Sequence, residues 1–172
     1  AMSQQAAPRI LSPLGKPTEY RSTYAPELLY PIPRQLKRDE LGISAASLPF
    51  VGEDIWNAYE VSWLNPRGKP VVALASFWVP ATSPNLVESK SLKLYLNSFN
   101  QTAFADAAAV EATLIRDLSA AAGSPVSAKI AVLSSRPQPT LGYPQGILLD
   151  DLDIVCDTYQ PAPQQLVAVD GE

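Results

Sequence analysis

Two stretches near the middle of the chain alternate between apolar and polar residues, which is the period of a β-strand. The first covers residues 57–64, and the second covers residues 70–79, which are rich in Val, Phe and Trp. One face of the first strand is expected to carry Tyr59, Val61 and Trp63. Between the strands, residues 65–68 place proline second and glycine fourth, as in a type I turn. The pattern therefore predicts an antiparallel hairpin.

Beyond this hairpin the apolar period becomes helical. Residues 81–87 indicate a loop, and Glu88 and Ser89 fall where that loop becomes a helix whose apolar positions are Leu92, Tyr95, Leu96 and Phe99. Asp106 is a typical N-cap for a second helix, and Gly123 is a typical residue just past its end. The buried face of this second helix is expected to comprise Ala107, Val110, Leu114, Leu118 and Ala121.

Two further strands are predicted after the helices, over residues 127–134 and 148–157. The inward side chains are expected to be Ala128, Ile130 and Val132 in one strand, and Leu152, Ile154 and Cys156 in the other. The predicted fold class is α+β, with a four-stranded antiparallel sheet, two helices on one face and the order ββααββ. Since such a sheet has two open edges, association with another copy or another domain is expected.

Residues 1–50 contain seven of the 17 prolines, which disfavours long regular elements there. The same segment is rich in tyrosine and leucine between residues 20 and 32. This apolar content predicts an ordered N-terminal arm packed on the rest of the domain.

Composition narrows the classes of function. The chain has 17 Asp and Glu against 13 Lys and Arg, which argues against nonspecific nucleic-acid binding. It has no histidine, the commonest general base and metal ligand, and one cysteine, which excludes an internal disulfide. No apolar run is long enough for a membrane helix, no signal peptide is evident, and Ala1 before Met2 indicates a tag scar. We expect a cytoplasmic protein that contacts neither membrane nor nucleic acid directly.

Glu88 is the main candidate for binding chemistry. A carboxylate at this helix start can accept two N–H bonds from a flat, purine-like heterocycle. The alternative is an acidic residue favoured by the helix dipole, and spacing alone favours that alternative. Lys90 and Lys93 are candidates to contact a phosphate or a dinucleotide, and the alternative is a solvated helix face. Ser89 and Ser91 are candidates to contact a ligand, and the alternative is that they cap the helix.

Other chemical motifs are weak. No glycine-rich Rossmann or P-loop motif is present. Cys156 has no histidine partner in the chain, and it is expected to be a small core residue. The acidic residues around it lack the spacing of a calcium loop, and no metal site is predicted. The residues by themselves do not predict a reaction.

The octet at residues 88–95, Glu-Ser-Lys-Ser-Leu-Lys-Leu-Tyr, resembles the signature of the QueF family, the NADPH-dependent nitrile reductases of queuosine biosynthesis, a tRNA modification. The resemblance extends over about residues 11–160. Other segments that are similar to the long, two-module form of these enzymes are Leu14–Tyr20, Leu48–Phe50, Asp54–Trp56, Tyr59–Asn65 and Leu96–Thr102.

The resemblance implies a tunnelling fold (T-fold) and reduction of 7-cyano-7-deazaguanine to 7-aminomethyl-7-deazaguanine with two NADPH. It implies that Val87, Glu88 and Ser89 bind the deazaguanine, and that Ser89 and Lys90 bind NADPH. It also implies a homodimer for the full-length form.

In the two-module form the nucleophilic cysteine, the proton-donating aspartate and a substrate-binding histidine belong to the second module, so no catalytic residue is expected in this chain. Residues 1–50 are then the arm, 51–160 the tunnelling-fold module, and 161–172 a linker toward an absent C-terminal module. This chain alone is expected to be inactive. The alternative is a deazapurine-binding or dimerisation module of the same fold without chemistry.

Overall fold

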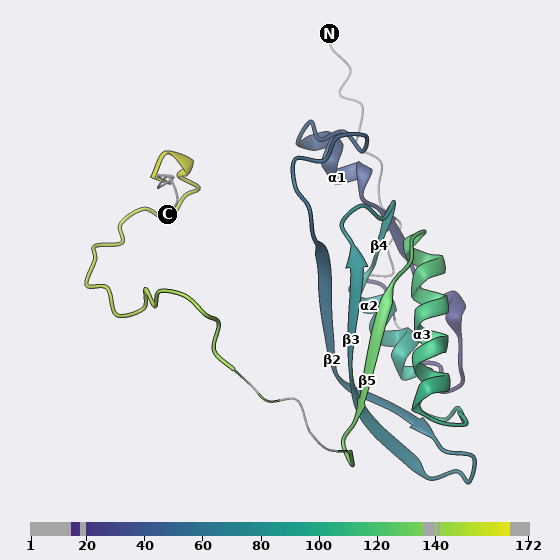
Figure 1. Ribbon diagram of the computed structural model, residues 1–172. Helices are drawn as coiled ribbons and strands as arrows, with labels where there is room; N and C mark the ends of the chain where they lie inside the picture. The colour runs from purple at the N-terminus through teal and green to yellow at the C-terminus, as the bar shows by residue number, and fades with distance from the viewer. Residues whose placement is uncertain (1–14, 18–19, 136–139, 141, 166–172) are drawn as a thin grey trace. The chain divides into compact units, whose positions relative to one another are not determined.

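The computed structural model describes residues 15–17, 20–135, 140 and 142–165. The chain divides after Pro139 into two compact units, and each is considered by itself. The first unit has a mixed α+β fold built on an antiparallel sheet with the strand order β2-β3-β5 (Figure 1). The expectations for residues 1–14, 18–19 and 136–139, and for residues 166–172 of the linker, lie outside the described residues.

The predicted hairpin is confirmed as β2 (Glu53–Leu64) and β3 (Pro70–Pro80). Its turn closes with a hydrogen bond of 2.9 Å from the Gly68 N–H to the Asn65 carbonyl. The expected position of Tyr59 is wrong, because this residue is 75% exposed whereas Val61 and Trp63 are buried. The pairing register shifts between Ala58 and Val61, and such a bulge reverses the faces on which alternate side chains lie.

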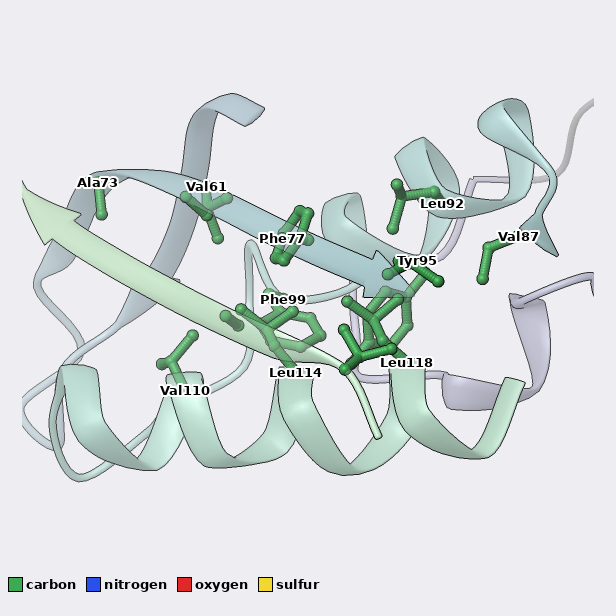
Figure 2. Packing of buried hydrophobic residues seen from close by; sticks show 14 of the residues in the cluster. Val61, Ala73, Phe77, Val87, Leu92, Tyr95, Phe99, Val110, Leu114 and Leu118 are labelled. Atoms are coloured by element: carbon green, nitrogen blue, oxygen red, sulfur yellow. The ribbon is translucent and has the colours of Figure 1, made fainter. Parts of the chain in front are cut away.

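Both predicted helices are present, as α2 (Ser89–Asn97) and α3 (Ala107–Ala122), and both pack on one face of the sheet (Figure 1). Asp106 caps α3 through its side chain, and Gly123 ends it with a left-handed φ of 70°. The third predicted strand is confirmed as β5 (Ser127–Val132), which pairs with β3. The core between sheet and helices comprises, among others, Val61, Ala73, Phe77, Tyr95, Phe99, Val110, Leu114 and Leu118 (Figure 2).

The N-terminal arm is described from Tyr20 onward. It contains a 3-10 helix, η1 (Pro26–Leu28), a short strand, β1 (Pro31–Pro33), and a helix, α1 (Gln35–Glu40). Strand β1 pairs with β4 (Asn85–Val87), so part of the predicted loop before Glu88 is a strand. Three residues of the arm, Tyr24, Leu28 and Leu29, pack against the core.

The predicted fourth strand over residues 148–157 is wrong. This segment has no strand, and the sheet of the first unit has three strands in the described part of the chain. Most of its apolar side chains are exposed, and Cys156, which was expected in the core, is exposed as well. Alternation sets which side chains share a face, but a strand also needs a paired neighbour, and residues 148–157 have none among those described. The second unit ends its described part with a short 3-10 helix, η2 (Pro163–Gln165).

Candidate functional site

Glu88 is the N-cap of α2. Its backbone is extended, and its carboxylate oxygens accept the N–H groups of Lys90 and Ser91, each at 2.8 Å. The residue is 5% exposed, and its own N–H donates to the Tyr30 carbonyl at 2.9 Å. The carboxylate is thus fixed at the positive end of a helix, where backbone donors and the dipole stabilise negative charge. A carboxylate has about four acceptor positions, so two backbone donors do not exhaust its capacity.

The neighbours of Glu88 have different surroundings. Val87 is buried and belongs to the hydrophobic core. Ser89 is exposed, and its hydroxyl lies 3.4 Å from Glu88 Oε1. The Lys90 ammonium donates to the carbonyl of Lys16 in the arm at 2.8 Å. The predicted site residues therefore form one continuous segment, with Val87 and Glu88 buried and Ser89 facing solvent.

A cavity of about 380 Å³ opens between β2 and α2, next to Ser89. Its lining includes the apolar side chains of Trp56, Phe77, Leu92 and Leu96. It also includes hydroxyl, amide, ammonium and carboxylate groups, from Asn57, Glu60, Ser62, Ser89, Lys93, Asn97 and Asn100. A cavity of this volume that combines apolar side chains with polar groups is typical of a small-molecule site. Ser89 and Lys93 lie one helical turn apart, so both present their side chains to it.

The family model described as "Nitrile reductase, 7-cyano-7-deazaguanine-reductase N-term" matches residues 20–130. The chain belongs to this family. The resemblance seen in the octet at residues 88–95 is therefore confirmed for most of the first unit, including β2, β3, both helices and the described arm from Tyr20.

Three curated relatives carry the name NADPH-dependent 7-cyano-7-deazaguanine reductase. The protein of Dechloromonas aromatica (strain RCB) is 67% identical over 97% of this chain and 59% of its own length. The protein of Azoarcus sp. (strain BH72) is 65% identical over 92% of this chain and 57% of its own length. The protein of Aromatoleum aromaticum is 64% identical over 88% of this chain and 54% of its own length. The chain thus spans a little over half the length of these reductases.

Three of the segments that resemble the long reductases contribute residues to the cavity lining. Residues 54–56 and 59–64 lie in β2, Asn65 begins the turn after it, and residues 96–102 include the end of α2. The cavity arises because β2 and α2 are neighbours, which no local pattern reveals. The contact between Tyr30 and Glu88 was also missed, because the two residues lie far apart in sequence.

A second buried carboxylate, Asp117 on α3, lies apart from the cavity lining. One oxygen accepts the hydroxyls of Tyr24 and Tyr95 at 2.6 and 2.7 Å, and the other accepts Arg116 Nε at 2.9 Å. Burial, followed by the hydrogen bond to Asp117 and its negative charge, raises the pKa of both tyrosines. The cluster joins the arm to α2 and α3, and both hydroxyls stay protonated at neutral pH.

The described residues also lack two other kinds of feature. None of their helices combines the length and the apolar content that crossing a bilayer requires. Within the same residues, no three His, Cys, Asp or Glu side chains gather in a way that would hold a metal ion.

Proposed function

We propose that this chain is the N-terminal half of a cytoplasmic NADPH-dependent 7-cyano-7-deazaguanine reductase of queuosine biosynthesis. The observation that carries the proposal is 67% identity over 97% of the chain to a protein of that name. The module has the tunnelling fold, which is supported by the sheet order β2-β3-β5 and by the position of α2 and α3 between β3 and β5 along the chain. Residues 1–50 are its arm, 51–160 the module and 161–172 a linker to a C-terminal half.

In this proposal Val87, Glu88 and Ser89 bind the deazaguanine. Glu88 supplies acceptors for the ring N–H and the adjacent amino group, and the backbone bonds from Lys90 and Ser91 hold its carboxylate in place. A preformed acceptor avoids the entropic cost of ordering a flexible side chain when the ligand binds.

NADPH would supply hydride to the nitrile carbon when bound, and Ser89 and Lys90 are proposed to contact it. The donor set fits an anionic dinucleotide, because Ser89 and Lys93 place a hydroxyl and an ammonium beside the cavity. The nucleophilic cysteine and the proton-donating aspartate are proposed to lie in the C-terminal half. Cys156 is not proposed as the nucleophile, since the chain has no histidine to activate it and the resemblance assigns the nucleophile to the second module.

Association with a second copy, as in a homodimer, or with the C-terminal half is part of the proposal. Strands β2 and β5 form the edges of the sheet, and apolar side chains are exposed on the face away from the helices, including those of Ile55, Tyr59 and Val72. Such a surface supports pairing with another sheet. The same exposed surface is also consistent with the alternative, in which this chain is a deazapurine-binding or dimerisation module without chemistry.

Reductase activity distinguishes half of a reductase from a binding or dimerisation module. The test protein, called the completed enzyme here, is this chain joined to the part of the Dechloromonas aromatica relative that it does not cover. We expect no NADPH oxidation with 7-cyano-7-deazaguanine from the 172 residues alone, and activity from the completed enzyme. Activity of the 172 residues alone would refute the assignment of chemistry to the other half. An inactive but folded completed enzyme would favour the binding module.

Glu88→Ala in the completed enzyme tests the substrate site. We expect a loss of about 100-fold in kcat/KM, because the buried ring donors lose a charged acceptor. Asp106→Ala is the matched control, since Asp106 also caps a helix, at 2.8 Å from the Ala109 N–H, and lies outside the proposed substrate segment of Val87, Glu88 and Ser89. Both variants should lose similar stability, about 0.5–2 kcal/mol, but only the first should lose activity. Unchanged kinetics for Glu88→Ala would count against this role.

A further inference from the structure

Three residues, Tyr30, Glu88 and Ser91, form a closed set of hydrogen bonds at the start of α2. The Tyr30 N–H donates to Ser91 Oγ at 3.0 Å, and Ser91 Oγ donates to the Glu88 carbonyl at 2.7 Å. The Glu88 N–H in turn donates to the Tyr30 carbonyl at 2.9 Å, and the Ser91 N–H donates to Glu88 Oε2 at 2.8 Å. Both ends of the Glu88 residue, its backbone and its carboxylate, are therefore bonded within this set.

Ser91 is 0% exposed, so its hydroxyl cannot donate to a ligand from its position in the structure. Its one hydroxyl proton goes to Glu88, and it accepts a proton from the arm. We propose that Ser91 is a positioning residue, which fixes the Glu88 carboxylate by holding the arm at Tyr30. The inference rests on the proposed substrate role of Glu88.

The physical reason is that Ser91 Oγ is the acceptor for the arm N–H at Tyr30, the residue whose carbonyl accepts the Glu88 N–H. Without Ser91 Oγ, the Tyr30 N–H loses its acceptor in a partly buried place, and the backbone must shift to reach water or another acceptor. The Tyr30 carbonyl then moves away from the Glu88 N–H, and the N-cap loses one of its restraints. Small displacements of a binding group are costly when it must meet two donors at once.

Ser98 provides a matched control on the same helix face. It is also 0% exposed, accepts an arm N–H, that of Ala25, at 3.1 Å, and donates to a carbonyl of its own chain segment, that of Tyr95, at 2.6 Å. Among the described residues, its hydroxyl bonds to Ala25 and Tyr95 and not to Glu88. Removing either hydroxyl loosens the arm, but only Ser91 lies next to the proposed substrate carboxylate.

The test compares Ser91→Ala with Ser98→Ala in the completed enzyme. We expect similar drops in melting temperature for the two variants. The KM for 7-cyano-7-deazaguanine should rise about tenfold for Ser91→Ala and stay within about twofold for Ser98→Ala, with kcat little changed in both. Equal KM values for the two variants, or an unchanged KM for Ser91→Ala, would overturn the proposal. If the alanine variant of Ser91 does not fold, Ser91→Cys and Ser98→Cys decide the comparison, since sulfur fills the site with weaker hydrogen bonds.

A double variant shows whether Ser91 acts through Glu88. When Glu88→Ala is already present, Ser91→Ala should raise KM no further, because the group it positions is gone. A further tenfold rise would refute action through Glu88. Should Glu88→Ala itself leave KM unchanged, the substrate role of Glu88 fails. Should Glu88→Ala raise KM while Ser91→Ala and Ser98→Ala behave alike, only the positioning role fails.

Discussion

Replacing Asp117 with alanine should destabilise the first unit by about 2–4 kcal/mol. The exposed ion pair with Arg116 contributes little to this sum, about 0–1 kcal/mol, because the Arg116 side chain is 65% exposed. The larger loss comes from the hydroxyls. Tyr95 is 0% exposed, and its hydroxyl would lose a charged acceptor at 2.7 Å, which costs about 1–3 kcal/mol. Tyr24 adds less, because it keeps a hydrogen bond of 2.6 Å from Arg116.

Equilibrium unfolding in urea measures this loss. The three tryptophans, Trp56, Trp63 and Trp78, all lie on β2 and β3, so their fluorescence reports on the first unit. Asp117→Asn is the control, because it keeps the shape and one acceptor oxygen, and it should lose about half as much stability. Tyr95→Phe removes the same hydrogen bond from its other end.

The combination of the two substitutions identifies the source of the loss. Asp117→Ala should cost about 1–2 kcal/mol less in a Tyr95→Phe background than in the wild-type chain, because no buried hydroxyl is then left without an acceptor. An equal cost in both backgrounds, or a loss below about 1 kcal/mol in the wild-type chain, would refute the reasoning from the buried hydroxyl.

Two further predictions concern pH and backbone geometry. Because burial raises the folded-state pKa of Tyr95, its contribution is fully present below the usual tyrosine pKa, about 10, and is lost above it. Between pH 9 and pH 11 the free energy of unfolding should therefore fall by about 1.4 kcal/mol more for the wild-type chain than for the Tyr95→Phe variant. An equal fall in the two proteins would contradict this reasoning. Gly123→Ala should destabilise more than Gly68→Ala, because both have positive φ but only the first places Cβ against another residue, 2.7 Å from Pro84 Cγ. Urea unfolding measures this difference, and equal costs would mean that Pro84 moves aside at no cost.

Local signals were sufficient for most of the first unit. The period of residues 70–79, the proline and glycine of the turn, and the caps Asp106 and Gly123 each act over a few neighbours, and all are confirmed. The face of Tyr59 was wrong because a bulge depends on the pairing with β3, not on the strand's own sequence. The strand expected over residues 148–157 failed for a related reason, since a strand forms only beside a partner.

The candidate site was predictable in part. The octet at residues 88–95 located the helix start and Glu88, because a signature of this kind is a continuous segment. The contacts around it join distant segments. Tyr30 meets Ser91 across 61 positions, and Tyr24 meets Asp117 across 93 positions. Periodicity describes one element at a time, so it carries no information about which hydroxyl receives which N–H of the arm.

The hydrogen bonds between the arm and the segment from Ser91 to Thr102 also have a consequence for synthesis. The arm donates its N–H groups at Tyr30, Ala25 and Tyr24 to hydroxyls that follow 61, 73 and 78 positions later. The ribosome releases the donors first, and at about 5–20 residues per second the last acceptor follows after about 4–16 s. The arm therefore cannot form these three hydrogen bonds until the segment from Ser91 to Thr102 has left the ribosome.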